Sequence, residues 1–140
     1  ISACSTAKKA KVDTVDDVYT GTDTVEFLAK GVPDRIFFAT NKSKLTTASR
    51  DTLRKQATWM RKNKDVTVTV EGHADERGTR EYNLALGERR ANAAKDYLMT
   101  YGVSGKRISV ISYGKERPVN PASSPLAWSQ NRRSVTVKAN

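Results

Sequence analysis

The chain has 140 residues, with 25 Lys and Arg against 15 Asp and Glu, one Cys and one His. This length suits a single domain that folds without disulfides, and a lone cysteine excludes both an intrachain disulfide and a cysteine metal cluster. We expect no cofactor and no metal, and the net charge of +10 favours an anionic partner.

The charge is unevenly distributed along the chain. Residues 1–30 carry four basic and five acidic side chains, which leaves 21 basic and 10 acidic residues in 31–140, a net charge of +11. Apolar residues are sparse before residue 30, and such a stretch buries too little surface to offset the entropy lost on ordering. We therefore predict a flexible tether over residues 5–30 and one folded domain over residues 31–140.

The first half of the domain reads as strand, helix, strand. Residues 35–39 are short, apolar and aromatic, which favours a buried strand. Thr46 or Thr47 is a suitable N-cap for a helix that ends near Asn63. Its apolar positions at helical spacing are Leu53, Ala57 and Met60. Residues 66–71 alternate valine with polar residues, which predicts a half-buried strand.

The second half continues with a helix over residues 80–101, which Thr79 can cap. The apolar stripe of this helix has small residues in its middle, so we expect it to approach a sheet closely. A strand follows over 107–113, then a proline-rich loop over 114–132 and a final strand over 134–138. The order β-α-β-α-β-β predicts an α/β (α+β) two-layer fold, with two helices on one face of a four-stranded mixed sheet.

Two opposite charges are candidates for a binding site. Asp75 lies in a glycine-bounded loop after the second of these strands, and Arg90 lies 15 residues later in the second helix. At 100° per residue, Arg90 shares the flank of the apolar stripe with Asn83 and Leu86, whereas Arg89 faces solvent. An acid and an arginine that face one cleft can form an intramolecular salt bridge. Alternatively, they can clamp a zwitterion, the carboxylate binding an ammonium and the guanidinium a carboxylate.

The residues around these charges form an extended motif. It consists of VEGHADERGT at residues 70–79, EYNL at 81–84 and LGERRANA at 86–93. This motif resembles the OmpA-like peptidoglycan-binding domains of diderm bacteria. The resemblance covers residues 34–138 and also includes the segments ISV at 108–110, SYGKERP at 112–118 and NRR at 131–133.

The resemblance implies a ligand and a set of contacts. The ligand would be the meso-diaminopimelate of the peptidoglycan stem peptide, whose side chain ends in an α-amine and an α-carboxylate. Asp75 would accept the amine and Arg90 would grip the carboxylate. The other contacts that the resemblance implies are Leu86, Thr40 and Asn41, with Asn83 and Arg77 as plausible neighbours. Relatives often carry an aromatic residue at Thr40 and an acidic one at Asn41, so these two positions depart from the family pattern.

The first four residues, Ile1 to Cys4, are similar to the end of a lipoprotein signal, in which small residues precede a lipidated cysteine. The alternative is an isolated cysteine without a role. Lipidation of Cys4 would anchor the protein in the outer membrane of a diderm bacterium, facing the periplasm.

These features together predict a non-enzymatic, lipid-anchored protein that binds peptidoglycan non-covalently and tethers the outer membrane to the cell wall. The resemblance further implies a role in the Tol system, in envelope integrity and in cell division, with the β-propeller protein TolB competing for the peptidoglycan site. One alternative is an adaptor that acts mainly through TolB. Another is a nucleic-acid-binding module, which the aromatic content of 7% disfavours.

Overall fold

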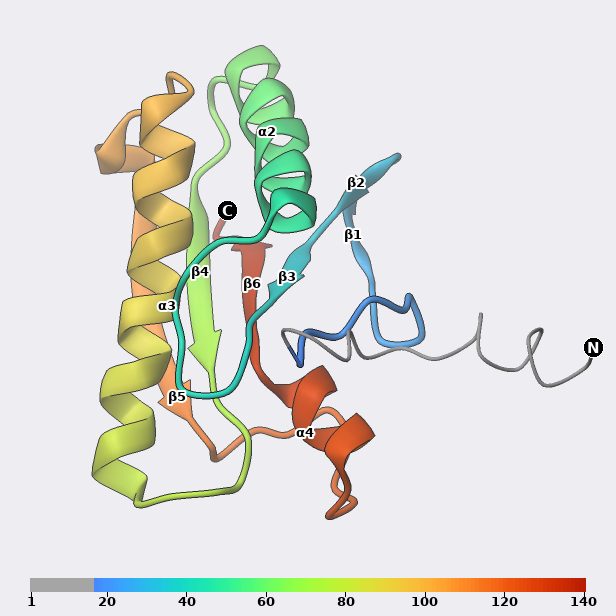
Figure 1. The fold of residues 1–140 in the computed structure, drawn as a ribbon. Coiled ribbons are helices and arrows are strands. Elements are labelled where there is room, and N and C mark those ends of the chain that lie inside the picture. Colours follow the sequence, from blue (N-terminus) through green and yellow to red (C-terminus); the bar gives the residue numbers. More distant parts are fainter. Residues whose placement is uncertain (1–16) are drawn as a thin grey trace, which may run out of the picture.

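A four-stranded mixed sheet forms the centre of the fold (Figure 1). The computed structural model describes residues 17–140. The sheet order is β3 (Arg35–Phe37), β6 (Arg133–Lys138), β4 (Val68–His73) and β5 (Ile108–Gly114). Strands β4 and β5 are parallel, and β6 runs antiparallel to both of its neighbours. The predicted two-layer α+β fold is confirmed, although β4 begins and ends two residues later than the sequence pattern indicated.

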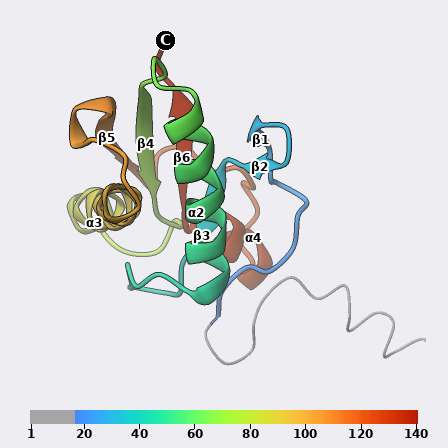
Figure 2. The ribbon, with the colours of Figure 1, turned by 90° about the horizontal axis from the view of Figure 1, so that it is seen from above.

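Two long helices cover one face of this sheet, as predicted (Figure 2). They are α2 (Thr47–Lys62) and α3 (Arg80–Thr100). Both predicted N-caps are confirmed, since the hydroxyl oxygens of Thr46 and Thr79 accept hydrogen bonds from backbone N–H groups three residues further on, at 3.0 and 3.1 Å. The caps and the apolar faces together fix where the helices begin and which side they bury.

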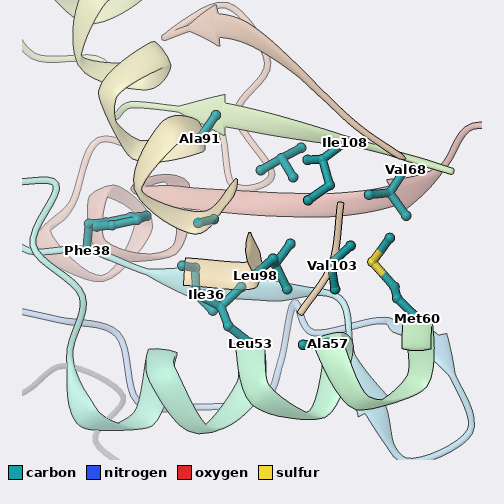
Figure 3. Packing of buried hydrophobic residues seen from close by; sticks show 12 residues of the cluster. Ile36, Phe38, Leu53, Ala57, Met60, Val68, Ala91, Leu98, Val103 and Ile108 are labelled. Carbon is teal, nitrogen blue, oxygen red and sulfur yellow. The ribbon is translucent and has the colours of Figure 1, made fainter. Parts of the chain in front are cut away.

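The hydrophobic core lies between the helices and the sheet (Figure 3). The side chains of Leu53, Ala57 and Met60 point from α2 into the space between the layers and are at most 1% exposed. Ala91 and Leu98 meet them from α3, and both are fully buried. Valine and isoleucine side chains on the facing side of the strands complete the cluster.

Two glycines allow a close approach of α3 to the sheet. A Cβ atom added at Gly72 of β4 would lie 1.6 Å from the carbonyl oxygen of Gly87 in α3. One added at Gly87 would lie 2.3 Å from Oγ of Ser112 in β5. The small residues predicted in the middle of the helix stripe therefore let the backbones of α3 and β4 touch, which brings the N-terminal half of α3 alongside the carboxyl end of β4.

The segment predicted as a loop over 114–132 contains a short helix, α4 (Pro125–Asn131). Ser124 caps it and Pro125 occupies its first turn, a combination that favours helix initiation. A 3₁₀ turn, η1 (Gly105–Arg107), also precedes β5. The prediction of an irregular loop was wrong because it counted prolines as breakers, whereas a proline in the first turn is compatible with a helix.

A flexible tether was predicted over residues 5–30. In the structure, residues 17–30 instead pack against the domain. Val18 and Tyr19 are buried against Phe37, and the rings of Tyr19 and Phe37 meet edge to face with centroids 4.8 Å apart. Strands β1 (Phe27–Ala29) and β2 (Val32–Pro33) form a small second sheet. A few apolar side chains order this segment because they cover a part of the central sheet that the helices leave open.

The predicted lipidation site, Cys4, and the rest of residues 1–16 lie outside the described residues. Within residues 17–140, no helix combines the length and the apolar composition that crossing a bilayer requires.

Replacement of Gly72 by alanine tests the backbone contact between β4 and α3. Because the added methyl group would overlap backbone rather than a flexible side chain, we expect the free energy of unfolding to fall by about 3 kcal/mol or more. Urea denaturation measures it. Gly105→Ala is the matched control, since its methyl group would meet only the side chains of Met99 and Lys95. Equal stabilities of the two variants would contradict the contact.

Candidate functional site

The residues singled out in the sequence surround one pocket. It has a volume of about 510 Å3 and opens where β4 ends, between the first half of α3 and the loop from β3 to α2. Its lining residues are Thr40, Asn41, Asp75, Arg77, Gly78, Thr79, Tyr82, Asn83, Leu86 and Arg90. All seven residues predicted to contact a ligand are in this set. Tyr82, Gly78 and Thr79 were not predicted.

Arg90 is completely buried at the base of this pocket. Its Nε donates to the carbonyl oxygen of Lys42 at 2.9 Å, Nη1 to that of His73 at 2.9 Å and Nη2 to that of Ala39 at 3.0 Å. The guanidinium also lies 5.2 Å from the ring centroid of Phe38. Arg90 therefore binds the loop after β3 and the end of β4 to α3, and it points inward as the helix geometry predicted.

Asp75 is also buried, with 6% of its surface exposed. Its carboxylate accepts hydrogen bonds from the Arg77 backbone N–H at 3.0 Å, from Arg77 Nη2 at 2.8 Å and from Arg132 Nη1 at 3.1 Å. Its ion pairs within the described residues are with Arg77 and Arg132, not with Arg90. The intramolecular Asp75–Arg90 salt bridge that the sequence left open is therefore absent from this part of the chain.

Arg77 covers the outer side of Asp75. Its side chain is 40% exposed, donates to the Thr40 hydroxyl at 3.1 Å and lies with its guanidinium carbon 4.2 Å from the ring centroid of Trp128. The indole N–H of Trp128 in turn donates to the Glu76 carboxylate at 2.7 Å. The rim of the pocket is thus a partly exposed layer of hydrogen bonds and a cation–π contact between the loop after β4 and α4.

The loop that carries Asp75 is fixed from two sides. Asn83 is buried, and its side-chain amide donates to the carbonyl oxygens of Arg77 at 2.8 Å and Thr79 at 3.0 Å. Lys115 Nζ donates to the Gly78 carbonyl oxygen at 2.6 Å. Asn83 therefore supports the loop from α3, and Lys115 supports it from the end of β5.

The remaining predicted residues form opposite walls. Leu86 is buried on α3, one turn before Arg90, and supplies an apolar surface. Asn41 has a φ of 58°, the left-handed region that asparagine tolerates better than most residues. The amide at this position therefore suits the backbone of the loop after β3.

Both central charges stay ionised near neutral pH. Burial raises the pKa of Asp75, but hydrogen bonds from Arg77 and Arg132 outweigh it, so the pKa lies below its usual range. Burial, together with the neighbouring positive charge of Arg132, lowers the pKa of Arg90 to about 9. The pocket therefore presents a carboxylate and a guanidinium that are held by separate partners.

His73 packs inside the protein rather than lining the pocket. Its Nε2 lies 3.0 Å from the Glu71 carboxylate, and its ring stacks on Tyr113 with centroids 5.5 Å apart. Burial lowers the pKa of His73, so the imidazole is neutral at pH 7 and the contact with Glu71 is a hydrogen bond rather than an ion pair.

Two residues that hold the pocket from behind were missed. Arg132, the residue between α4 and β6, bonds Asp75, and Asp17 pairs with Arg132 at 3.1 Å. The only sequence signal for Arg132 was its place in the NRR segment, to which no role was assigned. Asp17 gave no signal, since it lies in the segment predicted to be a tether.

With this geometry in view, comparisons identify the class of protein. The sequence model of the OmpA family matches residues 37–132, so the chain belongs to the OmpA family. Within it, the chain is similar to peptidoglycan-associated lipoproteins. It is 55% identical to that of Mesorhizobium japonicum and 56% identical to that of Rhizobium meliloti over 106 residues, which is 76% of this chain and 63% and 60% of those proteins. The chain thus spans about three-fifths of the length of the curated relatives it matches.

Solved structures agree with this assignment. The crystal structure of the peptidoglycan-associated lipoprotein from Burkholderia pseudomallei has a TM-score of 0.73 and 32% identity, over 75% of this chain and 89% of that one. The C-terminal domain of Helicobacter pylori MotB has a TM-score of 0.71 at 23% identity, over 76% of this chain and 84% of that domain. The second likeness supports the fold alone.

The acid sensitivity of the fold tests how Asp75 is held. Because the pKa of Asp75 is lowered in the folded protein, its contribution to stability is present above its unfolded pKa of about 3.9 and is lost as the pH falls through the folded value. We expect Asp75→Asn to be less stable than the parent at pH 7, with the difference shrinking as the pH falls below about 4.

Urea denaturation across this pH series measures the effect. Asp96→Asn, at an exposed position of α3, is the matched control. A stability difference between parent and Asp75→Asn that stays constant from pH 7 to pH 2 would show that the Asp75 pKa is not lowered.

Proposed function

We propose that this domain binds peptidoglycan non-covalently, by gripping the free α-amine and α-carboxylate of meso-diaminopimelate in the stem peptide. Asp75 accepts the ammonium and Arg90 donates to the carboxylate. Leu86 packs against the methylene chain, and Thr40 and Asn41 supply polar contacts across the pocket. The names of the similar proteins, which are peptidoglycan-associated lipoproteins, support this choice of polymer.

One observation carries the proposal: two buried, opposite charges border the same pocket without pairing with each other. Three of the five N–H donors of Arg90 bind backbone carbonyls, so two remain without a partner in residues 17–140. A bidentate carboxylate is the ligand that best suits such donors. The end of an amino acid carries both an ammonium and a carboxylate, so it supplies the two charges that Asp75 and Arg90 complement.

Arg77 must share Asp75 with the incoming ammonium or leave it. The Arg77 side chain is 40% exposed, so water can solvate its guanidinium when a ligand ammonium takes its place on Asp75. Once released, the guanidinium lies at the rim of the pocket, where it can contact a second carboxylate of the stem peptide.

On this proposal the protein belongs to the cell envelope. Lipidated Cys4 anchors it in the outer membrane, facing the periplasm, and the residues that follow Cys4 connect this anchor to the folded domain. The domain then tethers the outer membrane to the wall as part of the Tol–Pal system, in support of envelope integrity and cell division. The word lipoprotein in the names of its relatives supports the anchor.

TolB is the proposed protein partner, competing with peptidoglycan for one surface. Exposed apolar side chains occur on the elements that border the pocket, with Tyr82 at 42% exposure on α3 and Leu126 at 40% on α4. A partner that contacts Tyr82, which lines the pocket, covers the pocket mouth, so its binding and that of the wall exclude each other.

Sedimentation with purified sacculi tests the role of Asp75. Loss of a charge-assisted hydrogen bond costs about 1.5–3 kcal/mol, so we expect Asp75→Ala to lose at least about tenfold in affinity. Asp96→Ala, which removes the same side chain from an exposed position on α3, serves as the control. Undiminished sedimentation of Asp75→Ala, with a native circular dichroism spectrum, would refute the proposal.

The role of Arg90 is better tested by changing the ligand, because removal of its side chain leaves three buried carbonyl oxygens without a donor. Calorimetric titration compares a stem tripeptide that has a free diaminopimelate α-carboxylate with the same peptide amidated there. We expect amidation to weaken binding about tenfold or more, because the charge that Arg90 contacts is removed. Equal affinities for the two peptides would exclude this contact.

A further inference from the structure

We propose that Asp17 and Arg132 are positioning residues that tune the pocket toward the ammonium end of its ligand; this rests on the proposed peptidoglycan function. The observation is a closed ring of polar contacts. Arg132 bonds Asp75 and Asp17, each at 3.1 Å. Thr40 donates its hydroxyl hydrogen to Asp17, and Arg77 closes the ring by donating to Thr40 at 3.1 Å and to Asp75 at 2.8 Å.

Arg132 is held rigidly in this ring. Only 1% of its surface is exposed, and its Nε donates to the carbonyl oxygen of Phe38 at 2.9 Å. Its two terminal nitrogens then reach Asp75 and Asp17. Neither Arg132 nor Asp17 lines the pocket, so they act on it through Asp75 and Thr40, which do. Groups that orient a binding carboxylate from behind affect ligand affinity without touching the ligand.

Asp17 also balances the local charge. The cations gathered here are Arg77, Arg90 and Arg132, and the carboxylates that meet them are Asp75 and Asp17. Removal of the Asp17 charge leaves three cations against one carboxylate. The potential in the pocket then becomes more positive, which disfavours a ligand ammonium and favours a ligand carboxylate.

Asp17 lies outside the part of the chain that matches the OmpA family, which begins at residue 37. Its place is fixed by the residues that follow it, since Val18 and Tyr19 are buried against Phe37. The φ of Asp17 is 61°, a left-handed conformation in which aspartate is over-represented. The N-terminal segment therefore contributes the negative charge of Asp17 to the site. The region that matches the OmpA family does not contain this charge.

Calorimetric titration with two stem tripeptides tests this assignment. One ends in free meso-diaminopimelate, and the other is acetylated on the side-chain α-amine, so that it keeps the carboxylate and loses the ammonium. We expect Asp17→Asn to bind the free peptide about three- to fivefold more weakly than the parent, as for a partly exposed charge, and the acetylated peptide no more weakly. The preference for the free peptide then falls by at least that factor.

Two variants separate charge from structure. Asp17→Glu keeps the charge and is expected to restore most of the preference, whereas Asp23→Asn, an exposed acid in the same segment, is expected to leave it unchanged. Parallel loss of affinity for both peptides in Asp17→Asn would indicate a merely structural role and overturn the inference. An unchanged preference would overturn it as well, with the proposed function intact. A parent protein that binds neither peptide would overturn both.

Discussion

The buried guanidinium of Arg90 is the interaction on which the site depends. One side chain of α3 donates to carbonyl oxygens of Ala39 and Lys42, which flank the pocket residues Thr40 and Asn41, and to that of His73 at the end of β4. Burial of a charge is costly unless hydrogen bonds compensate it, and here three carbonyl dipoles and the nearby Asp75 carboxylate offset part of that cost. The lowered pKa of Arg90 shows that the remaining part is not compensated within the protein. The three hydrogen bonds keep the loop after β3, the end of β4 and α3 in one fixed arrangement.

That arrangement also requires α3 to lie unusually close to the sheet. The contact between Gly72 and Gly87 brings backbone against backbone, so no side chain separates the helix from β4 at this level. Arg90, almost one turn further along α3, then reaches carbonyl groups of both neighbouring segments. The two glycines contribute no chemistry to the pocket, yet they set the distance across which its charged groups act.

The sequence predicted the features that local rules determine, which are the helix caps and the orientation of helix side chains. The caps at Thr46 and Thr79 gave both long helices, and the helix wheel placed Arg90 inward and Arg89 outward, as the structure has them. The actual partners of Asp75 could not be predicted, because Arg132 is 57 residues away and no periodic pattern encodes such a pairing. For the same reason the burial of Val18 and Tyr19 was missed: isolated apolar residues give no signal until the surface that they cover is known. The helix α4 was different, since Ser124 and Pro125 carried a recognisable start signal that was interpreted as a loop.

The ion pair between Arg77 and Asp75 gives the proposed site a means of discrimination. A ligand that brings only an ammonium replaces one cation on Asp75 by another and gains little. A ligand that also brings a carboxylate gains the remaining donors of Arg90 and the guanidinium that Arg77 withdraws from Asp75. Specificity is a difference between affinities, and an internal competitor lowers the affinity of the wrong ligand more than that of the right one. The occupied carboxylate in the free protein is thus consistent with a site that selects a dipolar end over a simple amine.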